Sequence, residues 1–368
     1  MKETILNFTG DFCSSGMFKK VLVEKKSIFS ESVFSFLNSS DANVINFEGP
    51  ETSLSNYLRK DVDTRQAHGS IEFLQSINNT ILNFANNHIF DSGIDGFLET
   101  QKLSKEHNVV YFGAGANKRQ AIKSLIYRNN GIAIALIGIS HKEGLTATDT
   151  NFGVCSDCHE NEIIKEISKL KDSVDWIVLS YHGGEEFVQF PMPRRRKKLK
   201  KWLKYVDIVV AHHSHSFQGV EFFSQNKAIF YSLGNFVFDI PQHKPYSWVN
   251  RSALLRIHFK KNSWYYAFMP ICINTTKGEV CKGSQHFMRF TKILSKMSYV
   301  SWLKSCYKVV LFSKKIKSKN LIKDNLETFY FKIFNYIIKS YRLIFSRRDY
   351  RPVFLGYLFY KFLKWGRN

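Results

Sequence analysis

The chain has 368 residues, of which 44% are hydrophobic and 23% charged, which is enough for a folded protein with a large core. This composition excludes a disordered chain, and no run of 18 apolar residues predicts a transmembrane helix. The net charge is +22, and residues 301–368 alone carry 16 lysines and arginines against 3 acidic residues. The excess predicts an acidic neighbour, either an anionic polymer or the anionic surface of a membrane.

The start of the chain and its cysteines both favour a cytoplasmic protein. The opening stretch MKETILNFTGD has too short an apolar part for a secretory signal, so we expect no signal peptide. The six cysteines form no regular framework and are expected to be reduced thiols. The stretch CSDCH at 155–159 matches a haem-attachment pattern, but thiols in a surface loop are the favoured interpretation. Peripheral contact with the inner membrane face stays open.

Strands and helices are predicted to alternate over the first 275 residues. Helical spacing of apolar residues predicts helices over 92–108, 159–173 and 193–206. Short runs rich in Ile, Val, Leu and Phe predict buried strands at 4–10, 43–49, 80–86, 109–115, 132–140, 176–183, 207–213, 228–236, 253–259 and 265–273. This alternation is typical of an α/β layered domain.

The pattern changes after about residue 285. The remaining chain is predicted to be helical, with aromatic and aliphatic positions interrupted by Lys and Arg. We therefore divide the chain into a domain at 1–280 and a basic, aromatic-rich helical region at 281–368. Packing of this region on the core is the favoured interpretation, and docking of an amphipathic basic segment on an anionic membrane is the alternative.

Polar side chains follow the apolar runs at several predicted strand ends. They are Asp11, Glu48, Asn86, Asn87, His88, His182, His213, His215 and Asn235. The carboxyl ends of strands in an α/β sheet line the ligand crevice, so we expect these groups to meet there. Leaving them buried and unpaired would cost several kcal/mol each, which a metal centre would avoid.

The histidines at the end of the 207–213 run need particular attention. Side chains alternate along a strand, so His213 and His215 are expected on one face and His212 on the other. Carboxylate oxygens, an amide oxygen and imidazoles together suit Mn, Fe or Zn. Two carboxylates and three histidines exceed what one tetrahedral ion needs, which favours a centre with two divalent ions.

Several blocks resemble the CapA-type capsule and poly-gamma-glutamate synthesis proteins over residues 4–240. The blocks, in chain order, are GD, NFEGPET, ANNHIFDSGIDGFLET, YFGAGANKRQA, HGGEEFVQFPMP, IVVAHHSHSFQGVE and YSLGNFVFD. That family in turn resembles the calcineurin-like metallophosphoesterases. The resemblance implies a four-layer α/β metallophosphatase-like sandwich that holds two metals between the strand ends of two sheets.

The resemblance also implies residue roles. The implied metal ligands are Asp11, Glu48, Asn87, His182, His213 and His215. Asp11 would bind the first metal, Glu48 would bridge the two, and Asn87 and His182 would bind the second. His88 would be the catalytic acid or charge stabiliser beside the substrate. The supporting residues would be Asn86, Asp91, Glu186 and Asn235.

The chain departs from the family patterns at several positions. Cys13 stands where phosphoesterases have a histidine, and Glu48 stands where they have a bridging Asp. Gly183 and Phe187 replace the usual Trp and Tyr of the capsule family. These changes weaken the first metal site and bear on the choice of substrate.

Two functions of different classes follow. The leading one is a metal-dependent hydrolase, most simply a phosphoesterase, acting in capsule or exopolymer biosynthesis on an anionic polymer or a phosphorylated or lipid-linked substrate. Hydrolysis of a glutamyl bond is equally open. The alternative is a non-catalytic, membrane-associated accessory of a polymer-synthesis complex. A nucleic-acid partner is disfavoured because no recognisable binding module accompanies the charge. The basic run at 194–201 is interpreted as a solvated helix face in preference to a polyanion site.

Overall fold

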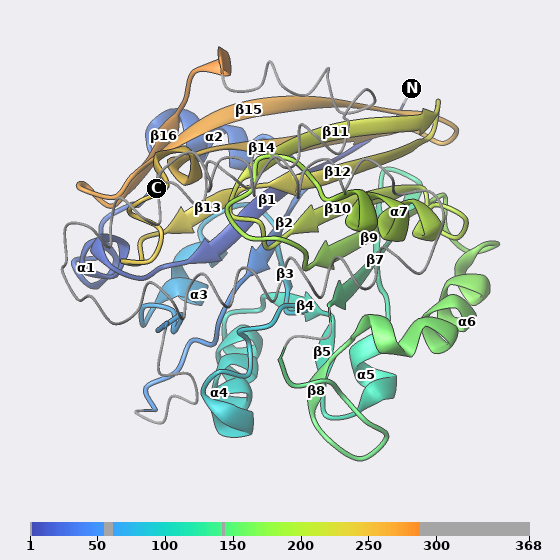
Figure 1. Ribbon diagram of the computed structural model, residues 1–368, viewed down its shortest axis with the longest axis horizontal. Coiled ribbons are helices and arrows are strands. Elements are labelled where there is room, and N and C mark those ends of the chain that lie inside the picture. Colours follow the sequence, from blue (N-terminus) through green and yellow to red (C-terminus); the bar gives the residue numbers. More distant parts are fainter. Residues whose placement is uncertain (1, 55–61, 142–143, 287–368) are drawn as a thin grey trace, which may run out of the picture. The chain divides into compact units, whose positions relative to one another are not determined.

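A computed structural model describes residues 2–54, 62–141 and 144–286 (Figure 1). The predicted helical region at 281–368 lies outside this description from residue 287 onward. In the described part of the chain, none of the helices combines the length and the apolar character that crossing a membrane requires.

The first sheet has a parallel part and an antiparallel part. Its strand order is β16-β15-β14-β1-β2-β3-β4, and β13 also pairs with β1. Strands β1 to β4 and β13 pair parallel with one another, whereas β14 pairs antiparallel with β1, β15 with β14, and β16 with β15. The bounds are β1 Thr4–Cys13, β2 Ala42–Phe47, β3 Thr80–Asn83, β4 Val110–Phe112, β13 Asn235–Phe238, β14 Arg251–Phe259, β15 Trp264–Asn274 and β16 Glu279–Lys282.

The second sheet is also mixed, with order β11-β12-β10-β9-β7-β6. Its four central strands are parallel, and β6 and β11 pair antiparallel at the two edges. The bounds are β6 Leu125–Asn129, β7 Ile132–Ser140, β9 Trp176–His182, β10 Ile208–His212, β11 Phe217–Ser224 and β12 Lys227–Leu233. A separate two-stranded sheet joins β5 Ala114–Gly115 to β8 Gly153–Val154.

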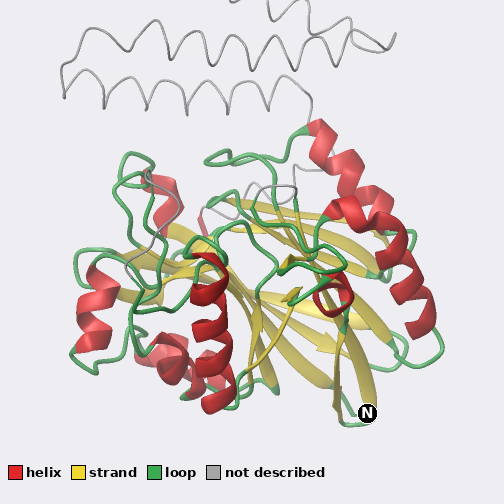
Figure 2. Cartoon of the chain, turned by 90° about the horizontal axis from the view of Figure 1, so that it is seen from below, coloured by secondary structure: helices red, strands yellow, loops and turns green. Residues whose placement is uncertain are grey.

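Helices cover the outer faces of both sheets, and Figure 2 shows them on either side of the strands. The α-helices are α1 Met17–Val23, α2 Glu31–Asn38, α3 Ser70–Gln75, α4 Gly93–Glu106, α5 Lys118–Ile122, α6 Glu160–Leu170 and α7 Pro193–Trp202. Two short 3₁₀ helices occur at Asp157–His159 and Ser247–Asn250. Apolar residues of α1 to α4 pack in a cluster with the first sheet, and those of α5 to α7 pack with the second.

The alternation of side chains along each central strand creates the layers. In β9, Val178 packs in the cluster between the sheets, whereas Ile177 and Leu179 pack in the cluster that also contains α6 and α7 residues. In β2, Val44 lies in the inter-sheet cluster and Ile45 in the cluster shared with the helices. Because both faces of each sheet are buried, the strands read as continuous apolar runs. The predicted four-layer α/β sandwich is confirmed.

The predicted strands and the three predicted helices are all present, with two subdivisions and several additions. The run at 109–115 divides into β4 and β5, and the run at 228–236 divides into β12 and β13. Strands β6, β8, β11 and β16 and the helices α1, α2, α3 and α5 were not predicted. These helices have only five to eight residues, too short for the 3.6-residue period to stand out.

The chain passes from one sheet to the other at Gly234. Strand β12 belongs to the second sheet and β13 to the first, and Gly234 between them has φ +79°. The Gly234 carbonyl accepts a hydrogen bond of 3.0 Å from the Asp11 backbone N–H. A Cβ at Gly10 would lie 1.9 Å from that same carbonyl oxygen. The two glycines therefore let the sheets approach closely beside Asp11.

The inter-sheet layer should dominate stability. Phe230 is fully buried there, among the rings of Tyr266 and Phe268. We expect Phe230→Ala to lower the free energy of unfolding by about 3–5 kcal/mol, measured by denaturant titration. Phe222, in the same hairpin but 48% exposed, is the matched control, and its replacement by Ala should cost clearly less. Equal losses would contradict this assignment of the core.

Candidate metal centre

Two buried carboxylates stand at the carboxyl ends of neighbouring strands. Asp11 lies in β1, Glu48 directly follows β2, and both side chains are fully buried. One Asp11 oxygen, Oδ1, accepts a hydrogen bond of 2.9 Å from Asn46. Both oxygens of Glu48 have no hydrogen-bond partner among the described residues, and Asp11 Oδ2 lies 3.2 Å from His215 Nδ1. Buried charge of this kind is costly unless a cation compensates it, so these oxygens mark a place for a positive charge.

Three histidines from the second sheet converge on Glu48. His182 ends β9, and His213 and His215 follow β10. The Nε2 atoms of His182 and His215 lie 3.7 and 3.9 Å from Glu48 Oε1, too far for hydrogen bonds. His213 Nδ1 lies 3.1 Å from His182 Nε2. The spacing leaves room for an ion between the carboxylate and the rings.

These side chains form two groups that could each hold a metal ion. The first group is Asp11, Glu48 and His215, and the second is Glu48, His182 and His213. Within each group, one ligand atom from every residue lies within 4.8 Å of the others. Glu48 belongs to both groups, which is the position that the family resemblance implied for the bridging carboxylate.

The loop after β3 brings an amide to the second group. Asn87 Oδ1 lies 2.8 Å from His182 Nε2, so it joins the donor atoms of that group. Asn86 holds the loop, because its Oδ1 accepts hydrogen bonds from the backbone N–H groups of His88 and Ile89. Its Nδ2 donates to the Phe47 carbonyl at the end of β2. The loop is thereby anchored to the strand that precedes Glu48.

His88 stands beside the shared carboxylate without belonging to either group. Its Nε2 lies 3.7 Å from Glu48 Oε1, and its Nδ1 lies 2.6 Å from Asp91 Oδ2. Thr64 donates a hydrogen bond of 3.2 Å to that same Asp91 oxygen. Asp91 therefore orients the imidazole of His88 so that Nε2 faces the centre.

The electrostatics of the centre favour neutral imidazoles in the second group. Burial, followed by the neighbouring imidazoles, holds the pKa of His182 and His213 well below the usual value. Burial and the charge of Asp11 raise the pKa of Glu48. At His215 burial disfavours the protonated ring, but the carboxylates of Glu48 and Asp11 outweigh the effect of burial and raise the pKa of His215 to about 10. Neutral imidazole is the form that binds metals, and these donors suit Mn, Fe or Zn.

The expectation that His213 and His215 share a strand face was wrong. Strand β10 ends at His212, and His213 and His215 have φ +84° and +51° in the turn that follows. The turn directs His213 to the second group and His215 to the first. His212 contacts Ser180 at 3.1 Å and lies 3.8 Å from Asp11 Oδ1, outside both groups.

Cys13 does not replace the missing histidine in this structure. Its buried thiol contacts the Thr64 carbonyl at 3.5 Å and packs with Phe238 and Ile240. Burial raises the pKa of the thiol, which disfavours the thiolate that a metal would bind. The first group consequently contains only three candidate ligand residues within the described chain.

The other supporting residues lie around the rim. Asn235 Oδ1 lies 2.8 Å from His215 Nδ1, so Asn235 orients that ring. Glu186 Oε1 lies 3.8 Å from His213 Nε2, and its side chain is 48% exposed. The ring of Phe187 stacks on His215 with a centroid distance of 5.7 Å. Glu186 is thus placed at the solvent side of the centre, and Phe187 forms part of its wall.

Three residues next to the centre were not among the candidates predicted from the sequence. Asn46 lies two residues before Glu48, and its amide nitrogen contacts Asp11 and His182. His141 directly follows β7, and its backbone N–H donates 2.7 Å to the His182 carbonyl. The strand-end pattern could have identified His141. The ring of His243 packs 4.4 Å from that of His215, and no spacing in the sequence indicates this contact.

The basic run in α7 is largely occupied by internal contacts. Arg195 is buried and donates to Gln218 Oε1 and to the His212 carbonyl, at 2.7 and 2.9 Å. Arg196, Lys198 and Lys201 pair with Glu221, Asp157 and Glu160. The exposed residues of the run for which no ion pair occurs within the described part are Arg194, Lys197 and Lys200. Most of the run therefore secures α7 to its surroundings.

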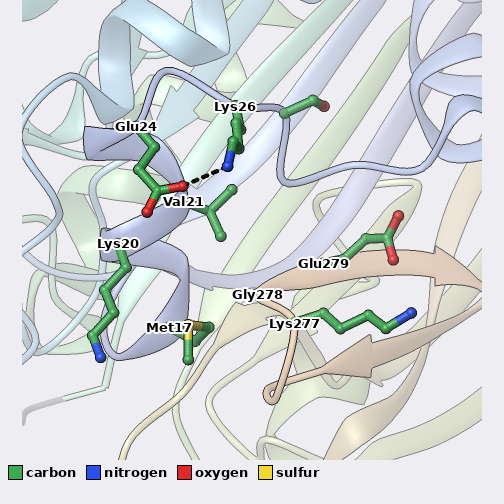
Figure 3. Close-up of a pocket in the computed structure, with 9 residues that line it drawn as sticks. Met17, Lys20, Val21, Glu24, Lys26, Lys277, Gly278 and Glu279 are labelled. Atoms are coloured by element: carbon green, nitrogen blue, oxygen red, sulfur yellow. Dashed lines mark hydrogen bonds and ion pairs between the residues drawn. The ribbon is translucent and has the colours of Figure 1, made fainter.

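A separate surface pocket of about 390 Å³ lies between α1 and the end of the β15–β16 hairpin (Figure 3). Its lining includes Lys20, Glu24, Lys26 and Lys277, and Lys26 pairs with Glu24 at 2.7 Å. None of the candidate metal ligands lines this pocket. The pocket and the metal centre are distinct features.

Comparisons with known proteins agree with the motifs. The family model described as "Bacterial capsule synthesis protein PGA_cap" matches residues 5–240. "PGA biosynthesis protein CapA" of Bacillus subtilis (strain 168) is 31% identical over 328 residues, which cover 85% of this chain and 84% of that protein. "Capsule biosynthesis protein CapA" of Bacillus anthracis is 34% identical over 239 residues, covering 62% of this chain and 56% of that one.

A 5'-nucleotidase from Candida albicans SC5314 is a distant match among solved structures. It is 10% identical, with a TM-score of 0.41, over 86% of this chain and 58% of that one, which is too remote to indicate an activity. The family model, in contrast, includes every candidate ligand described above, together with all of the second sheet and the parallel strands of the first. The chain therefore belongs to the bacterial capsule synthesis family PGA_cap, and the two CapA proteins are its relatives.

Proposed function

We propose that this protein is a metal-dependent hydrolase of the phosphoesterase type that acts in the synthesis of capsule or another extracellular polymer. The observation that carries the proposal is the pair of buried ligand groups that share Glu48. The donors are carboxylate, imidazole and amide oxygen, a set that suits two ions of Mn, Fe or Zn. Capsule synthesis enters through the family and through the names of the two relatives.

The residues of the centre divide into holding and reacting groups. Asp11 and His215 would hold one ion, and Asn87, His182 and His213 the other, with Glu48 between them. When bound, divalent ions at such a centre lower the pKa of water and neutralise charge on substrate oxygens. His88 stands ready to donate a proton from Nε2 to the leaving oxygen, because Asp91 holds its Nδ1 at 2.6 Å.

The substrate of this proposal is anionic. The formal net charge of +22 would favour an acidic polymer or a phosphorylated or lipid-linked intermediate. The exposed Arg194, Lys197 and Lys200 lie on α7, which begins eleven residues after His182. The same centre could instead cleave a glutamyl bond, and the substrate tests below distinguish this reaction from phosphodiester hydrolysis.

A non-catalytic accessory of a polymer-synthesis complex is the second candidate. The observation that favours it is the orientation of Cys13, which leaves the first group with three candidate ligands. A centre that does not retain its first ion would have lost one half of a two-ion mechanism. The metal content of the purified protein separates this candidate from the hydrolase.

The two groups predict distinct effects on metal content. We expect about two equivalents of Mn, Fe or Zn in the wild-type protein, measured by plasma mass spectrometry. His215→Ala should lose one equivalent, His213→Ala the other, and Glu48→Ala both, because Glu48 belongs to both groups. His258→Ala is the control, since His258 lies on β14, contacts Glu3 just before β1, and belongs to neither group. Absence of metal after reconstitution with each ion would favour the accessory.

The position of His88 predicts a loss of turnover without a loss of metal. With bis(4-nitrophenyl) phosphate as substrate, we expect His88→Asn to lower kcat by roughly 10²- to 10⁴-fold, as for removal of a general acid. Metal content should stay at the wild-type value, because His88 lies outside both groups. Wild-type turnover by the variant would refute the assigned role. Release of free glutamate from a gamma-glutamyl oligomer, with no phosphodiester cleavage, would replace the phosphoesterase by an amide hydrolase.

A further inference from the structure

We propose that Asn46 is the positioning residue that sets the geometry of both metal groups at once. The inference rests on the proposed metal centre and concerns a residue that belongs to neither ligand group. Asn46 lies in β2 on the face between the two sheets, where Ala42 and Val44 belong to the inter-sheet apolar cluster. An amide on this otherwise apolar face is costly unless its hydrogen-bonding groups are used.

The amide nitrogen of Asn46 contacts one member of each group. It donates a hydrogen bond of 2.9 Å to Asp11 Oδ1 and lies 3.2 Å from His182 Nδ1. Asp11 belongs to the first group alone and His182 to the second alone. Besides the shared ligand Glu48, the structure thus provides a second bridge between the groups, made by a side chain that ligates neither ion.

In both residues, Asn46 contacts a different atom from the one that faces the other candidate ligands. Asp11 Oδ1 is engaged by Asn46, while Oδ2 lies 3.2 Å from Nδ1 of His215, its fellow member of the first group. The His182 ring presents Nδ1 to Asn46 and Nε2 to Asn87 and Glu48. Asn46 therefore restricts rotation of the Asp11 carboxylate and of the His182 ring. Residues that orient metal ligands by hydrogen bonds to their other polar atoms raise the affinity of metal sites.

Asn46 is itself held by a chain of buried polar groups. Its Oδ1 accepts a hydrogen bond of 3.0 Å from Asn83 Nδ2, which also donates 3.0 Å to Ser180 Oγ. Ser180 Oγ lies 3.1 Å from His212 Nε2. This polar ladder, defined as Asn46, Asn83, Ser180 and His212, links β2 and β3 of the first sheet to β9 and β10 of the second.

The backbone makes room for the polar ladder at Gly138 of β7. A Cβ at Gly138 would lie 2.6 Å from Asn83 Oδ1 and 2.8 Å from the Cβ of Ala85. Asn83 Oδ1 in turn accepts a hydrogen bond of 3.1 Å from the Ala85 backbone N–H. Asn83 is therefore confined on several sides, and its position fixes the plane of the Asn46 amide.

The proposal predicts that replacing Asn46 weakens both metal groups together. We expect Asn46→Ala to raise the dissociation constants at both groups by roughly 10- to 100-fold, in separate titrations of the full chain with Mn²⁺ and with Zn²⁺. Isothermal calorimetry with a competing chelator gives affinity and stoichiometry, and the metal-induced rise in Tm gives a readout independent of activity. Asn83→Ala should shift both constants in the same direction by less, because Asn46 stays in place.

Asn43→Ala is the matched control. Asn43 is also a fully buried asparagine of β2. Its Nδ2 donates to the Leu37 and Asn78 carbonyls, and its Oδ1 accepts from Asn7 Nδ2. It contacts none of the candidate ligands in these bonds, so its replacement should lower stability while leaving metal affinity at the wild-type value. Circular dichroism checks the folding of each variant, and Asn83→Ala carries the test if Asn46→Ala does not fold.

The outcomes separate this inference from the proposed function. A wild-type protein that binds neither ion overturns the metal centre itself. Wild-type binding of two ions with unchanged affinities in Asn46→Ala overturns the role of Asn46 and leaves the centre intact. Loss at one group only also overturns it, since the role assigned to Asn46 spans both. Parallel weakening at both groups, absent in Asn43→Ala, supports the inference.

Discussion

The buried carboxylate of Glu48 is the constraint on which the rest of the centre depends. Its two oxygens have no hydrogen-bond partner among the described residues, yet the side chain is fully buried. A lone carboxylate in such a place is costly, and burial accordingly raises its pKa. Three imidazole nitrogens, from His88, His182 and His215, lie 3.7 to 3.9 Å from one of its oxygens. The arrangement is one that a pair of cations would complete.

The fold supplies this arrangement because the parallel strands of both sheets end at one edge. Asp11 and Glu48 come from the first sheet, and His182, His213 and His215 from the second. The close approach of Gly10 to the Gly234 carbonyl joins the sheets beside Asp11, where the chain crosses from β12 to β13. Asn235 begins β13 and orients His215. The crossing between the sheets therefore also supplies the residue that orients His215.

Polar groups between the sheets connect the ligands to the scaffold. An apolar layer would pack well, but it could not restrain the rotation of Asp11 or His182. The polar ladder does so at the cost of burying amides, and each of its hydrogen bonds joins adjacent strands or opposite sheets. Asp91 likewise orients the ring of His88, and Asn86 holds the loop that carries His88. The candidate ligands and His88 are thus held in place by residues that belong to neither ligand group.

Much of this protein was determined by local features of its sequence. Short apolar runs predicted the strands, because strands buried on both faces consist of consecutive apolar residues. The polar residues after these runs, Asp11, Glu48, His182 and His213, predicted the edge at which they meet, because the carboxyl ends of the strands line the ligand crevice. The sequence also indicated the family.

Tertiary structure alone decided that His213 and His215 serve different groups, since that depends on two left-handed residues in a turn. It also turned Cys13 away and placed Asn46 between Asp11 and His182. Such contacts join strands far apart in the chain, and the distance between two such strands is not encoded in either segment alone.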